Sequence, residues 1–228
     1  NLIVGTTSNG KRVYLFNTVA SKDTVIRKLI YVDSHKKNKW QDPVDVVIPG
    51  LKFGKSFINF YVNQQETVIL ISKPPQENKN DEDVFVSLKK EDGAWGELIN
   101  LGSTINTSRF ELASYISDDL KALYFSSEGH GGYGSSDIFV SYRLDDTWKN
   151  WTNPLNLGGT INSSDYEAFF VMATPNEVYF TSNKNSNHSS IYKAVATGGV
   201  VLANADSIYG EFIFKNLPEE AINLRIEN

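Results

Sequence analysis

The chain has 228 residues, of which 40% are hydrophobic and 21% charged, and its formal net charge is −5. This length and composition are typical of globular proteins with one large domain or two small ones. The negative charge argues against nucleic acid as a partner, because binding a phosphate backbone needs clustered Lys and Arg. The chain has no cysteine, which excludes disulfides and Cys-held metal sites, and its three histidines lack a paired metal-binding spacing. Because Cys is absent and His is sparse, we expect no bound metal, and we expect no cofactor. No apolar run is long enough for a membrane-spanning helix, so we expect no membrane-spanning segment.

Short apolar segments recur along the chain at intervals of about 55 residues, the kind of spacing that repeat arrays show. The first unit contains Tyr14–Asn17 and Trp40. The second contains Ile69–Ser72 and Trp95 at the corresponding places, together with the strand-like segment Asp83–Ser87. These two units are more diverged than the two that follow.

The repeat is clearest between residues 95–111, WGELINLGSTINTSRFE, and residues 151–167, WTNPLNLGGTINSSDYE, which lie 56 positions apart. A Trp, the words NLG and TIN and a final Glu stand at identical offsets in both. A fixed period is the mark of an array in which one supersecondary unit packs against copies of itself. The chain therefore contains four related units.

Each unit is expected to hold four short strands, and the third unit shows them best. Phe110–Ser117 alternates apolar and polar residues, as a half-buried strand does. Leu120–Ser127 is a more apolar second strand, Asp137–Tyr142 a third, and Trp148–Leu157 the outermost. Four antiparallel strands per unit at this period indicate a β-propeller blade. We predict an all-β fold, a β-propeller over residues 1–198 with four visible blades that are compatible with a larger ring of five or six.

Residues 199–228 break the rhythm of the repeat. Two strand-like segments, Glu211–Pro218 and Ala221–Glu227, surround a Pro-Glu-Glu turn. They either supply closing strands of the propeller or begin a separate small β-sandwich.

Residues 128–134, EGHGGYG, raise the question of a phosphate-binding loop. A phosphate cradle follows a strand and opens a helix, so that amides and helix dipole converge on the anion. Here the loop lies between two strands with no following Lys, so we predict a strand connection whose glycines supply positive φ. Asp137, like Asp83 in the second unit, is expected to accept amide hydrogen bonds that hold the preceding loop closed, with calcium as the open alternative. Trp95 and Trp151 are expected to be structural residues of the repeat.

Glu111 and Glu167 stand at the start of the innermost strand of adjacent units, and in a propeller that strand lines the central channel. Two carboxylates that face one funnel could cleave a glycosidic bond by acid–base chemistry. Because both belong to the repeat itself, a structural role is favoured over ligand binding, and ligand binding over catalysis. The other candidate binding residues are Arg109 and Asp165, which differ between units, the aromatic Tyr133 and Tyr166, and His130 in the glycine-rich loop.

The third unit reads YFSS at 124–127, GGYGSSDIFVS at 131–141 and NLG at 156–158. This pattern resembles the WD-like propeller repeat of OmpA-family and TolB-like envelope proteins of the Bacteroidetes type. Such proteins often continue with a carboxypeptidase-regulatory-like sandwich, which residues 210–218 resemble. The resemblance implies a periplasmic, outer-membrane-associated protein whose partner is an envelope protein or a peptidoglycan-associated glycan.

Together these features favour a non-enzymatic scaffold that binds protein or glycan through the loops and channel of a rigid ring. Two alternatives stay open. One is a glycosidase-like propeller that uses Glu111 and Glu167. The other is a propeller that gates a peptidase domain encoded elsewhere in the gene, since this chain has no GxSxG nucleophile elbow.

Overall fold

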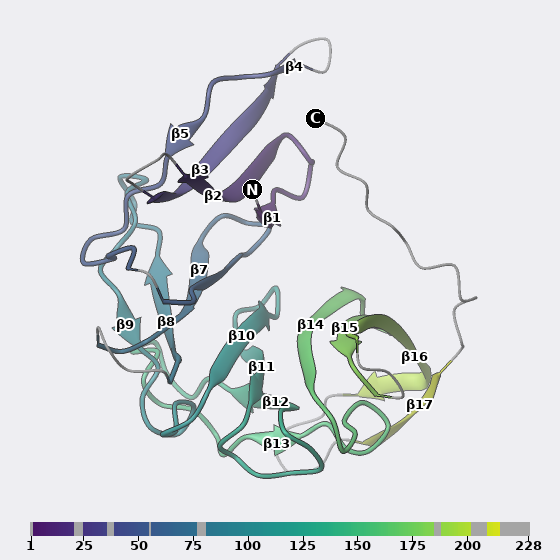
Figure 1. The fold of residues 1–228 in the computed structure, drawn as a ribbon. Coiled ribbons are helices and arrows are strands. Elements are labelled where there is room, and N and C mark those ends of the chain that lie inside the picture. The colour runs from purple at the N-terminus through teal and green to yellow at the C-terminus, as the bar shows by residue number, and fades with distance from the viewer. Residues whose placement is uncertain are drawn as a thin grey trace.

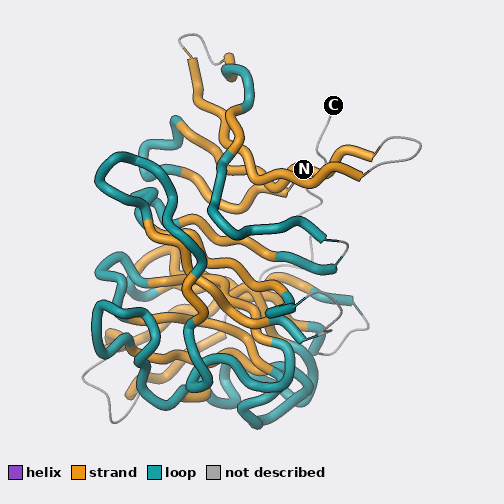
Figure 2. Tube along the Cα trace, turned by 90° about the vertical axis from the view of Figure 1, so that its left-hand side faces the viewer, coloured by secondary structure: helices purple, strands orange, loops and turns teal. Residues whose placement is uncertain are grey.

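The computed structural model describes residues 2–20, 25–35, 39–54, 56–76, 81–184, 188–201 and 209–214. Within these ranges all regular structure is β-strand, in four antiparallel sheets that follow one another along the chain (Figure 1; Figure 2). Val, Ile, Tyr and Phe in the strands fit a pleated and partly buried surface, and Gly, Asn, Asp and Ser between them fit turns. Among the described residues there is no helix capable of crossing a membrane.

The strands of each sheet are paired in chain order, except that the fifth strand of the first sheet pairs with its third, and the first strand of each sheet lies nearest the centre of the molecule (Figure 1). The first sheet contains β1 (Leu2–Thr6), β2 (Arg12–Ala20), β3 (Val25–His35), β4 (Lys39–Trp40) and β5 (Val44–Asp45). The second contains β6 (Asn59–Val62), β7 (Val68–Lys73), β8 (Asp83–Leu88) and β9 (Ile99–Asn100). The third contains β10 (Glu111–Ile116), β11 (Ala122–Ser127), β12 (Asp137–Tyr142) and β13 (Leu155–Asn156). The fourth contains β14 (Glu167–Thr174), β15 (Glu177–Ser182), β16 (Ser190–Val201) and β17 (Tyr209–Phe214).

The four sheets stand around a common axis as the blades of a β-propeller, so the predicted fold class is confirmed (Figure 1). We call them blades 1 to 4 in chain order. The outermost strand is shorter than predicted, because in blade 3 it is β13, Leu155–Asn156, instead of Trp148–Leu157. The preceding Trp151 forms only an isolated bridge with Arg143.

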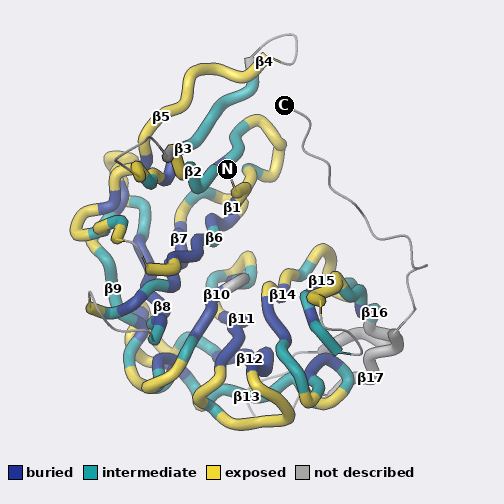
Figure 3. Tube along the Cα trace, viewed as in Figure 1, coloured by how far each residue is buried: buried dark blue, intermediate teal, exposed yellow. Residues whose placement is uncertain are grey.

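Blades 2 and 3 have neighbours on both sides, and their central strands are apolar on both faces. In β7, Ile69 and Ile71 pack toward blade 1, whereas Val68 and Leu70 pack toward blade 3. A strand buried on both faces reads as a continuous hydrophobic run, which is why this segment shows no alternation in the sequence. Figure 3 shows the buried residues of these strands concentrated between adjacent blades.

Blades 1 and 4 have a neighbour on one side only, and their strands alternate. In β15, Val178 and Phe180 are buried against blade 3, whereas Tyr179 and Thr181 are half-buried. Within the described ranges, no pair of strands from blades 1 and 4 makes an extended contact. Figure 1 accordingly shows an arc that is open between blade 1 and blade 4.

Three apolar clusters lie between successive blades and form the core. Fully burying one large apolar side chain is worth about 1.5–3 kcal/mol, so each blade is stabilised through its neighbours. Representative members are Tyr14, Leu29 and Ile71 between blades 1 and 2, Leu70, Leu123 and Phe125 between blades 2 and 3, and Tyr124, Phe170 and Phe180 between blades 3 and 4.

The sheet register corrects one alignment that the sequence spacing suggested. A spacing of 55 residues aligns Ile69–Ser72 with Tyr124–Ser127 and so matches Ser72 with Ser127. In the structure, however, Lys73 pairs with Asp83 and Ser127 pairs with Asp137. Because both aspartates begin the third strand of their blade, Lys73 is the true counterpart of Ser127. The repeat is therefore one residue shorter at this strand than the spacing indicated.

The repeated letters encode one hydrogen-bonded latch that recurs in blades 2 and 3. The Asn106 side chain accepts from the amide of Val84 at 2.7 Å and donates to its carbonyl at 3.0 Å. It also donates to Asn100 at 2.9 Å, and the Asn100 amide group donates to Asp83 at 2.7 Å. Blade 3 repeats these four bonds with Asn162, Ile138, Asn156 and Asp137. The latch ties the chain leaving a blade to the third strand of that blade.

The strand β17 pairs with β16 and is the outer strand of blade 4. The predicted closing strands or sandwich covered residues 199–228. Most of that segment, residues 202–208 and 215–228, lies outside the described residues.

Candidate functional site

The antiparallel order of each blade brings three segments to the same end of the propeller. These are the approach to the first strand, the end of the second strand and the start of the third. At this end Phe57, Phe110 and Tyr166 lie just before the first strands of blades 2, 3 and 4, Glu82 lies just before β8, and Glu128 lies just after β11. We call these five residues the mouth.

The sheet register places Phe57, Phe110 and Tyr166 at the same position in three successive blades. The rings of Phe57 and Phe110 are in contact, with centroids 6.0 Å apart and planes tilted by 50°. Phe57 is 50% exposed, and the other two are half-buried. Partly exposed rings beside polar groups are typical of ligand sites.

Glu82 and Glu128 flank the backbone of Phe110 and Glu111. The carbonyl of Glu82 accepts a hydrogen bond from the amide of Glu111 at 2.9 Å, which joins blade 2 to blade 3. The amide of Glu128 donates to the carbonyl of Phe110 at 3.1 Å within blade 3. Two acidic residues are thus fixed on either side of one aromatic residue.

Glu82 and Glu128 differ in their surroundings. Glu82 is only 7% exposed, whereas Glu128 is exposed. Burial, and then the charges of Asp81 and Glu128, raise the pKa of Glu82 above the usual range of a glutamate. Glu82 therefore holds its proton more tightly than an ordinary glutamate.

Tyr166 of blade 4 lies close enough to both acids to respond to their charge. Burial, and then the charges of Glu128 and Glu82, raise the pKa of Tyr166 to about 12. Its hydroxyl therefore stays protonated at neutral pH and remains a hydrogen-bond donor. The Tyr166 amide donates to the side chain of Asn183 at 2.8 Å, which fixes the start of β14.

Glycosidases use a pair of carboxyl groups, one of which is a general acid with a raised pKa. At the mouth, a buried glutamate with a raised pKa stands near an exposed glutamate. The neighbouring aromatic rings offer apolar surface to the apolar face of a sugar. The mouth thus combines two acidic residues with partly exposed aromatic rings.

The two repeated carboxylates that the sequence placed at the channel are fully buried, with 0% exposure. Glu167 accepts hydrogen bonds from the amide and hydroxyl of Ser163 at 2.8 and 2.6 Å, and from the hydroxyl of Ser182 at 2.6 Å. The matching set in blade 3 is Glu111, Thr107 and Ser127. Because donors of the blade itself occupy these oxygens, the geometry removes Glu111 and Glu167 from the catalytic pair that the sequence suggested.

The glycine-rich loop connects two strands, and its amides are already bonded. Asp137 accepts hydrogen bonds from the amides of Tyr133 and Gly134 at 2.5 and 3.1 Å. A Cβ atom on Gly134 would lie 2.3 Å from the carbonyl oxygen of Asp165, so only glycine fits beside that backbone. These bonds occupy the amides that a bound phosphate would need.

His130 and Tyr133 of this loop lie outside the mouth. The ring of His130 packs against Phe125 and Phe139, and its Nε2 lies 2.9 Å from the carbonyl oxygen of Ile105. Tyr133 is exposed on the loop surface. His130 is therefore engaged within the blade, and Tyr133 is accessible.

Arg109 and Asp165 directly precede Phe110 and Tyr166 and so stand at the rim of the mouth. Arg109 is exposed and Asp165 is half-buried. The carbonyl of Asp165 accepts from the amide and hydroxyl of Ser135 at 2.7 and 2.9 Å. The two side chains place opposite charges at equivalent positions of adjacent blades.

The remaining repeat residues lie within the blades and take part in their packing and hydrogen bonds. Trp95 and Trp151 are buried in the clusters between blades. Asp83 and Asp137 belong to the latches described above. In the part of the chain that the structure describes, no group of three or more His, Cys, Asp or Glu side chains could hold a metal ion.

Sequence reasoning missed Glu82, Glu128 and Phe57 as members of a site. One signal pointed to Glu82. The register puts it at the position of Ser136 in blade 3 and Ser189 in blade 4, so an acid replaces a small polar residue. A residue that differs from its counterparts in the other blades is not required by the repeat, so it is a candidate for binding or catalysis in its own blade.

No family model matches the chain, and no curated protein matches it by sequence. The resemblance to OmpA-family and TolB-like repeats therefore rests on the motif alone. A solved structure of an α-L-arabinanase from Penicillium chrysogenum, complexed with arabinobiose, is similar with a TM-score of 0.50 and 11% sequence identity. The match covers 84% of this chain, and the chain spans 60% of the length of the arabinanase. At this identity the similarity shows the propeller fold alone.

The expectation that the chain is not an enzyme is corrected, because a similar solved propeller is an α-L-arabinanase and the propeller fold therefore gives no support to a non-enzymatic reading. The expectation rested on the structural role favoured for the repeated carboxylates and on the resemblance to envelope scaffold proteins. A candidate acid need not be one of the repeated residues, and Glu82 is not repeated in blades 3 and 4.

Proposed function

We propose that this protein is a carbohydrate-active propeller that cleaves glycosidic bonds at the mouth, with Glu82 as general acid and Glu128 as its carboxylate partner. The observation that carries the proposal is Glu82 itself, a buried acid outside the repeat that stands beside an exposed acid and two contacting aromatic rings. The fold shared with an arabinanase that was solved with arabinobiose supports sugar as the class of ligand.

The chemistry follows from the two environments. A sugar ring rests on Phe57 and Phe110 with its glycosidic oxygen toward Glu82. The Glu82 proton passes to that oxygen as the bond to the anomeric carbon breaks, and Glu128 either activates a water or attacks the anomeric carbon itself. If Glu128 activates a water, it takes a proton from that water, the hydroxyl bonds to the anomeric carbon, and solvent exchange returns the proton to Glu82. If Glu128 attacks, Glu82 deprotonates a water that hydrolyses the glycosyl–enzyme ester, which frees the Glu128 carboxylate and restores the proton of Glu82.

The test is the release of reducing ends from a panel of neutral polysaccharides by the purified protein. We expect Glu82→Gln and Glu128→Gln to lower the rate by about 10²–10⁴-fold. The control is Glu97→Gln, an exposed acid at the opposite end of blade 2, which should leave the rate unchanged. No release from any member of the panel, or equal rates in wild type and Glu82→Gln, would overturn the proposal.

We also propose that the glycan belongs to the bacterial envelope and that the protein faces the periplasm in association with the outer membrane. The repeat motif supports this part of the proposal. Fractionation of the native cells, followed by immunoblotting, tests it. We expect the protein in the outer-membrane fraction, and recovery from the cytoplasm would contradict the assignment.

A further inference from the structure

The outer face of blade 1, which points away from blade 2, is unusually apolar for a sheet in water. Tyr14 and Phe16 of β2 turn toward blade 2, so the alternate residues form the other face. That face carries the cross-strand pair Val19 and Ile26, both 53% exposed, and Ile3, 63% exposed. An antiparallel sheet normally presents polar residues on its solvent side. The pattern therefore indicates a face that is built to be covered.

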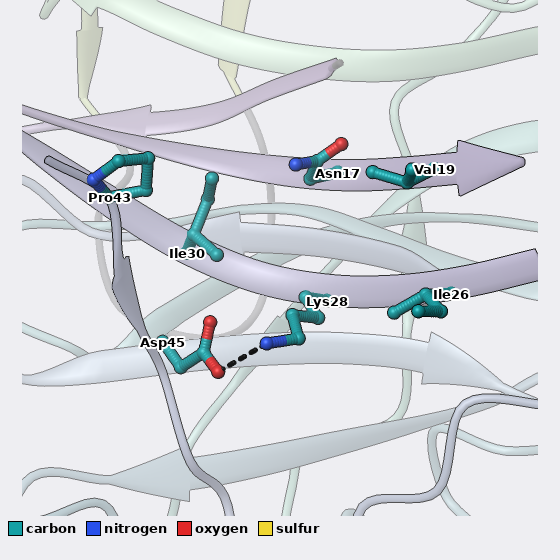
Figure 4. A pocket seen from close by; sticks show the side chains of 7 residues that line it. All are labelled: Asn17, Val19, Ile26, Lys28, Ile30, Pro43 and Asp45. Atoms are coloured by element: carbon teal, nitrogen blue, oxygen red, sulfur yellow. Dashed lines mark hydrogen bonds and ion pairs between the residues drawn. The ribbon is translucent and has the colours of Figure 1, made fainter.

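A pocket of about 290 Å³ opens on this outer face (Figure 4). Its lining includes Val19, Ile26 and Ile30 from the paired strands β2 and β3. Lys28 and Asp45 form an ion pair of 2.6 Å beside them. The face is thus hollowed and apolar, with a polar pair at its side.

In blades 2 and 3 the equivalent face is covered by the preceding blade. Ile69 and Ile71 of blade 2 are packed against blade 1, and Leu123 and Phe125 of blade 3 against blade 2. All four side chains are 0% exposed. The outer face of blade 1 continues the same series of blade-to-blade surfaces. Ile30 on this face is 4% exposed, but no strand of another described blade covers Val19, Ile26 or Ile3.

The face of blade 4 that points away from blade 3 is also uncovered by the other described blades, but it is more polar than the outer face of blade 1. Tyr179 and Lys193 pair across β15 and β16, and Lys193 forms an ion pair of 2.7 Å with Glu177. Ile191 on the same face is 56% exposed. Both uncovered faces border the opening of the arc in Figure 1.

We infer that a fifth blade, a four-stranded antiparallel sheet additional to residues 1–228, docks between blades 1 and 4 and buries the outer face of blade 1. It would present an apolar surface to Val19 and Ile26 and polar groups to Glu177 and Lys193. The similar propeller is longer than this chain, which spans 60% of it, and one further blade at the spacing of this repeat needs about 55 residues. Closure would remove the two exposed faces and complete the ring around the mouth.

The test uses the absence of cysteine from the chain. Val19→Cys and Ile26→Cys place single thiols on the outer face, and Leu144→Cys, at a position that is 63% exposed, is the control. Maleimide labelling is timed in the 228-residue chain and in the complete polypeptide that its gene encodes. We expect the control to react equally in both, and the two outer-face thiols to react at least about tenfold more slowly in the complete polypeptide, as a site closed in the folded state does.

Fast labelling of the outer-face thiols in the complete polypeptide would overturn the inference, and so would a gene that encodes no further blade. Slow labelling in the 228-residue chain that speeds up on dilution would also overturn it, because a second copy would then be the cover. Circular dichroism checks that each variant is folded. Asn17→Cys, at a polar position in the same pocket, replaces any variant that is not.

Discussion

The side chain of Asn162 satisfies both backbone groups of Ile138, accepting from its amide at 2.8 Å and donating to its carbonyl at 3.0 Å. Asn106 and Val84 repeat this relationship in blade 2. One amide side chain thus binds the connection between blades to the third strand of the blade it leaves. Asn106 and Asn162 are the last residues of the two TIN segments that the sequence repeats.

We expect Asn162→Ala to destabilise the protein by about 1–3 kcal/mol for each backbone group of Ile138 left unsatisfied. Urea unfolding followed by Trp fluorescence measures the change. Asn176→Ala, in the exposed turn between β14 and β15, is the matched control, and its effect should stay within about 0.5 kcal/mol. Equal stabilities of the two variants would show that the latch is not structural.

Glu167→Gln tests the structural role of the repeated carboxylates. The carboxylate accepts three hydrogen bonds from Ser163 and Ser182. In the Gln variant an NH₂ group would replace one carboxylate oxygen and would face these N–H and O–H donors. We expect a loss of about 1–3 kcal/mol in the free energy of unfolding, while the rate per folded molecule stays close to wild type. Loss of activity in a variant of normal stability would return Glu167 to the list of catalytic candidates.

Gly134→Ala tests the close approach between the glycine-rich loop and blade 4. A Cβ there would lie 2.3 Å from the carbonyl oxygen of Asp165 and 2.4 Å from that of Ser163. Such overpacking costs about 1–3 kcal/mol, so we expect a clear fall in Tm. Gly54→Ala is the control, because the nearest atom to its Cβ is 4.0 Å away. A fall of the same size in both variants would argue against this contact.

The stability of Glu82→Gln should depend on pH in a defined direction. Burial raises the pKa of Glu82 in the folded state, so the proton binds more tightly when the protein is folded. That contribution to stability is complete below the pKa of the unfolded state and is lost as pH rises through the folded pKa. The Gln variant cannot ionise, so its Tm relative to wild type should rise between pH 4 and pH 8. A flat or falling difference would contradict the environment assigned to Glu82.

The fold could be predicted because its elements repeat in sequence. The identical words in units two and three mark the latches, and the continuous apolar run of β7 marks a strand buried on both faces. The outermost strand was predicted too long, because Trp148 and Trp151 pack into the cluster between blades instead of extending β13. Hydrophobicity in this region therefore reflects packing, not strand pairing.

The site could not be predicted in the same way. Glu82 and Glu128 belong to different repeats, and only the antiparallel pairing brings the end of one strand and the start of another to the same end of the propeller. Glu82 departs from the repeat, and a search for repeated letters overlooks such a residue. Glu111 and Glu167 were conspicuous for the opposite reason, and the structure places both in the wall.

The role of Glu82 as general acid can be measured with two substrates that share one sugar and differ in the leaving group. A nitrophenolate leaves without a proton, whereas a sugar alkoxide must receive one from the acid. We predict that Glu82→Gln lowers the rate by about 10²–10⁴-fold on the sugar–sugar linkage and only slightly on the nitrophenyl glycoside. Equal losses on both substrates, or no loss on either, would contradict the assignment of Glu82.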